Sequence, residues 1–205
     1  MSGNDNFEVL VKIIIIGDSG VGKSNYLCRF AEGKFCPLYE ATVGFDYKSK
    51  ICILPNSQKK VKFQIWDTAG QEKYMSINKN LFQRVQGIIL MYDISEIKSF
   101  NNLPQWMKVV NQLAKGIPLI LIGNKIDLKD ERTVSKEIGK KFADDNNITF
   151  FESSGKSGEN VEETFLCLGE EIMKNYKIEE KKSSDCEYII SKESSFDNKK
   201  KKKCC

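Results

Sequence analysis

The stretch with the clearest chemical signature is GDSGVGKS at residues 17–24, which fits the spacing G-x-x-x-x-G-K-[ST]. It follows an apolar run and precedes a helix-like stretch, which is the context that this motif requires. Its glycines let backbone amides close around phosphate oxygens, and the following helix N-terminus adds its dipole. Lys23 would bridge the β- and γ-phosphates, and Ser24 would be a ligand of Mg²⁺. We therefore expect a phosphate-binding loop, which by itself does not select the base of a nucleotide.

A second motif, NKID at residues 124–127, could make that selection. It comes directly after the apolar run PLILIG, at the end of a predicted strand where α/β sheets bind ligands. The Asp127 carboxylate could accept hydrogen bonds from N1–H and the exocyclic amine of guanine, whereas adenine has neither donor there. A site built in this way can reject the wrong ligand by about 10⁴-fold. Asn-Lys-x-Asp alone is also typical of a surface turn, so the prediction depends on the phosphate loop upstream.

A third motif, WDTAGQE at residues 66–72, could act on the metal and on water. Asp67 at a strand end could hold Mg²⁺ through water, and the Gly70 amide could bind the γ-phosphate. Gln71 could orient the water that attacks it. Read one at a time, Asp67 would be an ordinary strand-end residue and Gln71 a solvated side chain. The three motifs together favour the functional interpretation.

The composition excludes several other classes of protein. The chain has 205 residues, 40% hydrophobic and 29% charged, and no histidine, which removes Ser-His triads and histidine zinc sites. Its net charge of +4 is smaller than the five positive charges of the terminal lysine run, so we expect no nucleic-acid-binding surface. Seven cysteines show no paired framework, and Cys28, Cys52 and Cys167 are predicted to be buried free thiols. No segment approaches the ~18–20 apolar residues that span a bilayer, and the N-terminus is not a secretory signal.

Two kinds of predicted strand alternate with helix-like stretches. Continuous apolar runs predict parallel strands that are covered on both faces, at residues 9–16, 87–93, 117–123 and 148–154. Residues 61–66 instead alternate between apolar and polar, and with the preceding segment 45–54 they predict a hairpin at an antiparallel edge. This order of elements indicates a doubly wound α/β sheet.

The last predicted helix marks the end of the domain. Asn160 is a suitable N-cap, with Glu163 three residues later as in a capping box. Apolar residues then recur at helical spacing and should face the core: Val161, Phe165, Leu168, Ile172 and Tyr176. After that the periodicity stops. We therefore predict one domain over residues 1–176 and a disordered tail over residues 177–205.

Taken together, the chain resembles a small GTPase of the Ras superfamily, and within it a Rab. GDSGVGKS, IWDTAGQE, NKID and ESSGK stand in the order of that family across residues 9–176, and YEATVGFDY resembles its switch I. The resemblance implies a three-layer P-loop NTPase fold of the α/β class, with a mostly parallel six-stranded sheet and one antiparallel edge strand. It also implies a monomeric GTP phosphohydrolase that needs Mg²⁺, hydrolyses GTP slowly and acts as a switch in vesicle trafficking.

The resemblance assigns roles residue by residue. The catalytic residues it implies are Lys23, Thr42 and Gln71, and the Mg²⁺ ligands are Ser24, Thr42 and Asp67. The nucleotide-binding residues it implies are Gly17, Ser19, Gly20, Val21, Gly22, Lys23, Ser24, Asn25, Phe35, Thr42, Gly70, Asn124, Lys125, Asp127, Ser154, Gly155 and Lys156. Gly155 stands where the family usually has alanine, which should matter little because that contact uses a backbone amide.

The surface that effectors read departs from the Rab pattern. The resemblance assigns this surface to Phe45, Tyr47, Trp66 and Leu81. Leu81 is aliphatic where Rabs usually have an aromatic residue, and the switch II stretch 81–85 differs from theirs. The hairpin between Tyr47 and Trp66 is also about two residues longer than is common. Nucleotide chemistry should be unaffected, whereas the identity of the effectors, the exchange factor and the GTPase-activating protein stays open.

The chain ends in NKKKKKCC, and as a Rab ending this resembles a site of double geranylgeranylation at Cys204 and Cys205. Two lipid chains anchor a protein stably where one does not, and lysines add attraction to the anionic cytoplasmic leaflet. We expect attachment to the cytoplasmic face of an intracellular or plasma membrane, with a cytosolic pool held by a GDP-dissociation inhibitor. The apolar patch at residues 188–190 could dock on the prenylation escort protein, with chance as the alternative.

Two other functions remain open at this point. A nucleotide-locked binding module without useful hydrolysis is disfavoured by Ser24, Thr42 and Gln71. A P-loop ATPase or kinase is disfavoured by NKID.

Overall fold

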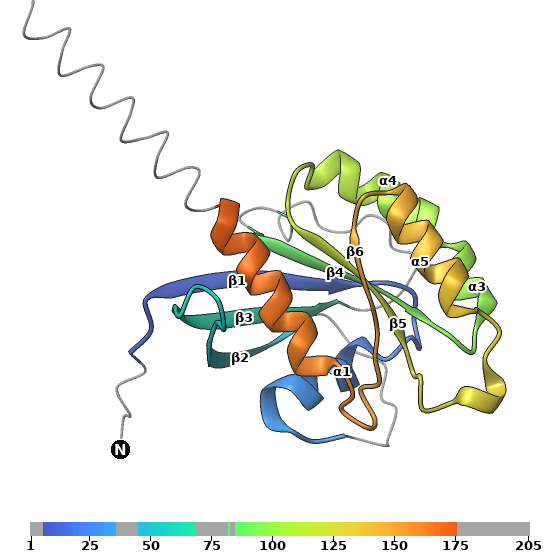
Figure 1. Ribbon diagram of the computed structural model, residues 1–205, viewed down its shortest axis with the longest axis horizontal. Coiled ribbons are helices and arrows are strands. Elements are labelled where there is room, and N and C mark those ends of the chain that lie inside the picture. The colour runs from blue at the N-terminus through green and yellow to red at the C-terminus, as the bar shows by residue number, and fades with distance from the viewer. Residues whose placement is uncertain (1–5, 36–44, 69–81, 83–84, 176–205) are drawn as a thin grey trace, which may run out of the picture.

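The computed structural model describes residues 6–35, 45–68, 82 and 85–175 (Figure 1). Six of the described segments form one sheet in the order β2-β3-β1-β4-β5-β6. All neighbouring strands pair in parallel except β2 and β3, which pair antiparallel. The strands are β1 Val9–Ile16, β2 Phe45–Ile53, β3 Lys60–Thr68, β4 Gly87–Asp93, β5 Leu119–Asn124 and β6 Thr149–Glu152. The predicted six-stranded sheet with one antiparallel edge strand is therefore confirmed.

The central strand β1 contributes side chains to both hydrophobic cores of the protein. Its isoleucines point alternately to opposite faces of the sheet. Ile13 and Ile15 pack into one cluster of buried side chains, and Ile14 and Ile16 pack into the other. A strand that is buried on both faces must be apolar at consecutive positions, which explains the continuous run in the sequence.

Helices cover both faces of the sheet, as Figure 1 shows. The described helices are α1 Lys23–Glu32, α3 Ile97–Asn101, α4 Leu103–Leu113, the short 3₁₀ turn η2 Lys129–Glu131, α5 Lys136–Asp145 and a C-terminal helix over residues 161–175. Apolar residues of α1 and the C-terminal helix belong to one core cluster, and those of α3, α4 and α5 to or against the other. The result is the three-layer arrangement that the sequence predicts.

The C-terminal helix packs as its periodicity predicts. Val161, Phe165, Leu168 and Ile172 are all buried, and Phe165 stacks on Phe30 of α1 with ring centroids 3.8 Å apart. Tyr176 lies outside the described residues. The Asn160 side-chain amide donates to the Glu152 carbonyl at 2.7 Å, so it ties the start of this helix to the end of β6.

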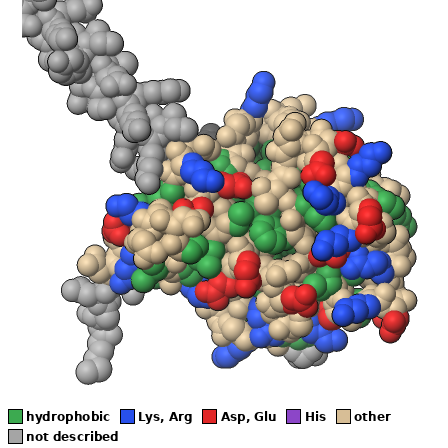
Figure 2. All heavy atoms as spheres, in the orientation of Figure 1, with side chains coloured by type: hydrophobic (Ala, Val, Ile, Leu, Met, Phe, Trp, Pro, Cys, Tyr) green, Lys and Arg blue, Asp and Glu red, His purple; other side chains and the backbone are tan. Residues whose placement is uncertain are grey.

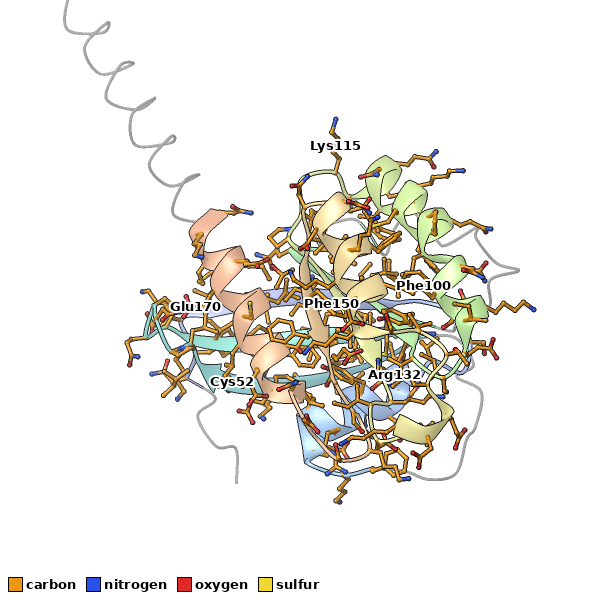
Figure 3. All side chains as sticks on the ribbon, turned by 45° about the vertical axis from the view of Figure 1, so that its right-hand side comes forward. Cys52, Phe100, Lys115, Arg132, Phe150 and Glu170 are labelled. Atoms are coloured by element: carbon orange, nitrogen blue, oxygen red, sulfur yellow. The ribbon has the colours of Figure 1, made fainter. Side chains whose placement is uncertain are left out.

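A carboxylate of the C-terminal helix holds the turn of the β2–β3 hairpin. Glu170, labelled in Figure 3, accepts hydrogen bonds from the backbone amides of Asn56 at 2.7 Å and Ser57 at 2.9 Å. Its side chain is largely buried, at 8% exposure. Two amide donors therefore compensate for burying the charge, and the edge hairpin is fixed to the body of the domain.

Several strand boundaries differ from the predicted ones by one or two residues, and the start of β5 and the end of β6 have a physical reason. β5 begins two residues after the predicted start because Pro118 has no N–H for the ladder, although its carbonyl still accepts from the Ile88 amide. β6 ends at Glu152, before the predicted residue 154, because the Ser154 amide binds the Glu159 carbonyl at 3.1 Å within a turn.

The cysteines in the described part of the chain are free, as predicted, but their burial differs. Cys52 is buried, whereas Cys28 and Cys167 are only half-buried. Burial raises the pKa of the Cys52 thiol and that of the Cys167 thiol, which favours the protonated, unreactive form.

One face of the protein is mixed in charge, and the described helices are all too short or too polar to span a membrane. On the face drawn in Figure 2, Lys and Arg side chains are interspersed with Asp and Glu side chains. Among the described helices, none is long and apolar enough to cross a membrane. The predicted domain boundary at residues 176–177 lies at the edge of the described residues.

Candidate functional site

The carboxyl ends of four strands meet at one edge of the sheet. Ile15 of β1 is in register with Asp67 of β3, and Asp93 of β4 is in register with Asn124 of β5. Parallel pairing brings the loops that follow these strands together, and this is where sheets of this class bind ligands. The topology therefore gathers the three sequence motifs, which are far apart in the chain.

The loop at residues 17–22 takes a shape that requires glycine at two positions. Gly17 has φ 140°, and a Cβ atom there would collide with the Met91 carbonyl of β4. Gly22 has φ 98° and forms the N-cap of α1, where a Cβ would lie 2.6 Å from the Asn124 side-chain nitrogen. Any larger residue would displace a neighbouring strand or the Asn124 side chain.

Lys23 holds its positive charge within this loop. Its side chain is 5% exposed, and Nζ donates to the carbonyls of Gly17 at 2.8 Å and Asp18 at 2.7 Å. The N-terminus of α1 adds the favourable end of the helix dipole at the same place. A fixed ammonium group beside a helix N-terminus suits a phosphate.

Ser24 and Asp67 offer oxygen atoms to a cation. The Ser24 hydroxyl donates to Asp67 Oδ2 at 2.5 Å, so the two side chains converge at the foot of the loop. A hydroxyl and a carboxylate are hard oxygen ligands of the kind that Mg²⁺ prefers. This pair of donors fits the predicted metal, which would take the rest of its ligands from phosphate oxygens and water.

Asn124 links the phosphate-binding loop to a second loop at residues 153–158. Its side-chain amide donates to the Val21 carbonyl at 2.8 Å, and its Oδ1 accepts from the Gly155 amide at 3.1 Å. The residue is 2% exposed, so both hydrogen bonds are shielded from water. Asn124 thus sets the distance between the two loops.

Asp127 is oriented from the second loop. Its Oδ1 accepts from the Ser154 hydroxyl at 2.6 Å, and its Oδ2 lies 3.5 Å from Lys156 Nζ. Ser154 Oγ in turn accepts from the backbone amides of Lys156 and Ser157. The carboxylate is therefore held in one orientation and keeps lone pairs for a ligand.

Asp93, the partner of Lys125, is a site residue that sequence reasoning missed. Lys125 Nζ pairs with Asp93 Oδ2 at 2.6 Å, and the Lys125 backbone has φ 69°, a strained value for a residue with a side chain. Such strain clusters at ligand sites, where the surrounding structure enforces it. Asp93 could have been found as an acidic residue at the end of the strand next to NKID.

A cavity of about 250 Å³ opens between these loops. Its lining consists of residues predicted to bind a nucleotide, with the single addition of Leu128: Gly20, Gly22, Asn25, Phe35, Asn124, Lys125, Asp127, Gly155 and Lys156. The structure thus brings together around one hollow residues that are up to 136 positions apart, from Gly20 to Lys156. Gly17, Ser19, Val21 and Ser154 belong to the two loops that border it, and Lys23 and Ser24 are the first residues of α1.

Asp18 is a second residue that the sequence did not mark. Its carboxylate is buried and accepts from Asn102 Nδ2 at 2.6 Å and Trp106 Nε1 at 2.8 Å. These donors come from the start of α4, so they hold the phosphate-binding loop from the face of the sheet that α4 covers. No local pattern announces such a contact.

Part of the predicted effector surface is described. Tyr47 of β2 and Trp66 of β3 are in register, with ring centroids 5.1 Å apart, and Tyr47 is 53% exposed. The remaining predicted site residues lie outside the described residues: Thr42, Gly70, Gln71, Leu81, Cys204, Cys205 and the side chain of Phe45.

Known proteins match almost the whole described chain. The Ras family model matches residues 12–174. The GTP-binding protein ypt1 of Schizosaccharomyces pombe is 42% identical over 170 residues, which is 82% of this chain and 83% of its own. The Ras-related protein Rab-8B of Dictyostelium discoideum is 40% identical over 200 residues, 97% of this chain and 95% of its own. The Ras-related protein RABD2c of Arabidopsis thaliana is 42% identical over 166 residues, 80% of this chain and 81% of its own.

Proposed function

The chain belongs to the Ras family and is a Rab-type small GTPase, a GTP phosphohydrolase, and from this we propose that it is a membrane-anchored switch in vesicle trafficking. In this proposal residues 1–176 bind GTP or GDP with Mg²⁺, and residues 177–205 tether the domain to a membrane. GTP would order the switch segments, and its hydrolysis would release them.

The cavity beside Asp127 is the observation that supports guanine as the base. It is bordered by the fixed carboxylate of Asp127 and by the loop of Gly155, and it opens beside the phosphate-binding loop. Asp127 would accept from N1–H and the exocyclic amine of guanine. With adenine the same charge would face no donor, which is costly in a partly buried site.

Hydrolysis would depend on charges that are already in place. Lys23 would hold the β- and γ-phosphates, and Ser24 with Asp67 would hold Mg²⁺, which supplies positive charge against the phosphate oxygens. We assign Thr42 to that metal as well and Gln71 to the attacking water. The chain has only three arginines, none in switch I, so a GTPase-activating protein would have to supply one. Without it the rate should be about 10⁻⁴ to 10⁻² s⁻¹.

Base selection is tested by Asp127→Asn. The wild-type protein should bind GDP and GTP but not ATP in a competition assay with fluorescent GDP. The asparagine side chain can donate to the oxygen that xanthine carries in place of the guanine amine, so the variant should prefer xanthosine nucleotides. An unchanged preference for guanine in the variant would remove Asp127 from the base site.

A nucleotide-locked module without hydrolysis is the alternative function, and single-turnover measurement of GTP hydrolysis separates the two. We expect slow but measurable turnover in the wild type. Gln71→Leu should lower that rate while GTP affinity stays unchanged. An unchanged rate would show that Gln71 does not position the water.

The tail would provide the membrane anchor. Geranylgeranyl chains on Cys204 and Cys205 give two signals, whereas one lipid chain gives only marginal binding. Each lysine near an anionic leaflet would add about 1 kcal/mol. Removing both cysteines should leave a folded, nucleotide-competent protein that stays in the cytosolic fraction. Membrane recovery of that variant would refute the anchor.

The remaining partners follow from the same proposal. Effectors would read Tyr47 and Trp66 together with Phe45 and Leu81, and an exchange factor would promote release of GDP. A GDP-dissociation inhibitor would carry the lipids through water. The prenylation escort protein would bind the patch at residues 188–190, and replacing its two isoleucines with serine should slow prenylation in a reconstituted assay.

A further inference from the structure

Arg29, near the end of α1, joins two segments that border the base cavity. Its Nε donates to the Gly155 carbonyl at 3.1 Å, and its Nη2 donates to the Lys156 carbonyl at 2.6 Å. Its Nη1 donates to the Gly33 carbonyl at 2.6 Å. One side chain therefore binds main-chain oxygens at positions 33, 155 and 156, more than a hundred residues apart in the chain.

Both joined segments carry residues of the cavity lining. Gly155 and Lys156 border it directly, and Phe35 lies two residues beyond Gly33. Gly33 is the C-cap of α1 with φ 68°, and its amide donates to the Arg29 carbonyl at 3.0 Å. The backbone and the side chain of Arg29 thus fix Gly33 together, and with it the position from which the chain departs toward Phe35.

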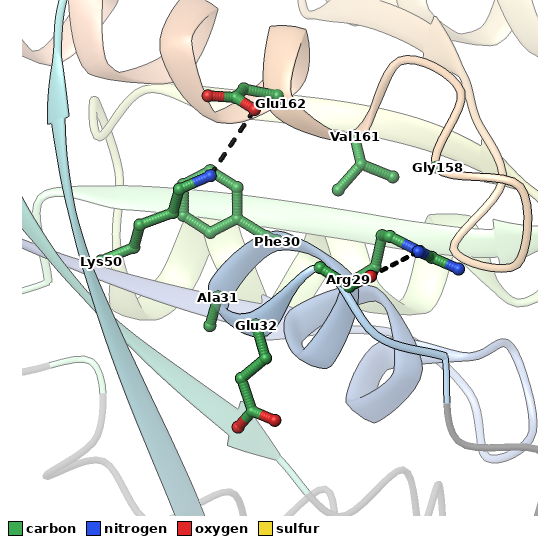
Figure 4. A pocket seen from close by; sticks show the side chains of 9 residues that line it. Arg29, Phe30, Ala31, Glu32, Lys50, Gly158, Val161 and Glu162 are labelled. Carbon is green, nitrogen blue, oxygen red and sulfur yellow. Dashed lines mark hydrogen bonds and ion pairs between the residues drawn. The ribbon is translucent and has the colours of Figure 1, made fainter.

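A hollow borders the place where Arg29 makes these contacts. Figure 4 shows its side chain between α1 and the loop that carries Gly158. A cavity of about 410 Å³ lies there, lined by Arg29, Phe30, Lys50, Val161 and Glu162 among others. On the side of the hollow, Arg29 and the loop have no packing partners, so the hydrogen bonds carry more of this contact.

The three contacts need the geometry of a guanidinium group. Its donors point along fixed directions of a plane, so three carbonyls around that plane can be bound at once. A lysine ammonium is a single point at the end of a flexible stem, and it would reach only part of this set. The interaction is therefore specific to arginine rather than to positive charge.

We propose that Arg29 is a positioning residue for the base: it holds the Gly155–Lys156 loop and the segment leading to Phe35 against the two sides of a bound guanine. It acts through main-chain oxygens and does not touch the ligand. This inference rests on the proposed function, because it presupposes that the cavity holds a guanine base.

The test compares wild type, Arg29→Ala and Arg29→Lys by release of fluorescent GDP in excess Mg²⁺ and by the ratio of GDP to ADP affinity. We expect Arg29→Ala to release GDP about tenfold faster. The variant loses three hydrogen bonds, and part of the lost free energy should appear as weaker binding of the ligand. The GDP-to-ADP ratio should fall with it. Arg29→Lys should recover less than half of the change on a logarithmic scale.

Glu170→Ala serves as the matched control, because it also removes anchors from side chain to main chain but at the β2–β3 turn. It should lower thermal stability and leave GDP release and base preference at wild-type values. If Arg29→Ala lowers stability yet releases GDP and discriminates bases as the wild type does, the role is only structural and the inference is wrong. If the wild type itself does not prefer GDP to ADP, the proposed function fails first.

Discussion

Replacing Asn124 with alanine should weaken nucleotide binding strongly, because one buried side chain links the two loops of the site. The change removes the 2.8 Å bond to the Val21 carbonyl and the 3.1 Å bond from the Gly155 amide. Both groups belong to buried residues. A buried polar group that loses its partner costs about 1–3 kcal/mol, so the two together cost about 2–6 kcal/mol.

Most of that cost should appear as lost affinity rather than lost stability. In the empty protein the two loops can separate slightly and admit water to the exposed groups. A bound nucleotide would hold the loops in place and exclude that water. At about 1.4 kcal/mol per factor of ten, affinity for GDP should fall by roughly 30-fold to 20,000-fold. The assay is the rate of fluorescent GDP release in excess Mg²⁺, with thermal unfolding of the nucleotide-free protein measured in parallel.

Asn146→Ala is the control for this prediction. Asn146 is exposed at the end of α5, where its side chain donates to the Phe142 carbonyl at 2.8 Å, far along the chain from either loop. GDP release from this variant should match the wild type. Release from Asn124→Ala that is less than about threefold faster would refute the reasoning, since the buried bonds would then carry little of the binding energy.

Three further predictions concern stability. The Tyr92 hydroxyl is buried without a hydrogen-bond partner among the described residues, so Tyr92→Phe should raise the free energy of unfolding by about 1 kcal/mol in urea titration; a loss of that size would reveal a bond. Burial raises the pKa of Tyr26 to about 12, whereas in the unfolded chain it is near 10. The unfolded chain therefore loses this proton first, so the urea midpoint should decrease as the pH rises from about 10 to 12 and should stay constant below about pH 10. Arg132 binds Glu152 through Nη1 at 2.5 Å and Nη2 at 3.2 Å, and Arg132→Ala should cost about 1–3 kcal/mol in the same titration; a cost below 0.5 kcal/mol would mean that solvent replaces the pair.

The sequence was sufficient for the parts of the fold that follow from local pattern. The runs at residues 9–16 and 87–93 became β1 and β4 with the predicted bounds, because Glu8 and Gly17 flank the first run and the second ends on the polar Asp93. The run at 117–123 was misplaced by two residues at its start, since its apolar letters do not show that Pro118 cannot join the ladder. The sequence thus predicts which faces of the strands are apolar better than it predicts the residues at which the strands begin and end.

The candidate site divides along a similar line. Residues within motifs, such as Asn124 and Asp127, were identifiable because their spacing reflects a ligand. Asp18 and Arg29 were not, because each has partners 84 to 127 positions away that are brought near only by the pairing of strands and helices. Contacts of this kind leave no periodicity in the chain.

The hydrogen bonds from the β2–β3 turn to Glu170 affect the order in which parts of the protein unfold locally. Turn amides usually exchange their hydrogens with solvent quickly, because a small local fluctuation exposes them. The amides of Asn56 and Ser57 are instead bonded to a helix 113 to 114 residues further along the chain. They can be released only when the carboxylate withdraws, so they should exchange together with the middle of the C-terminal helix. The hairpin and that helix should then form one cooperative unit, so that β2 and β3 loosen only together with the C-terminal helix.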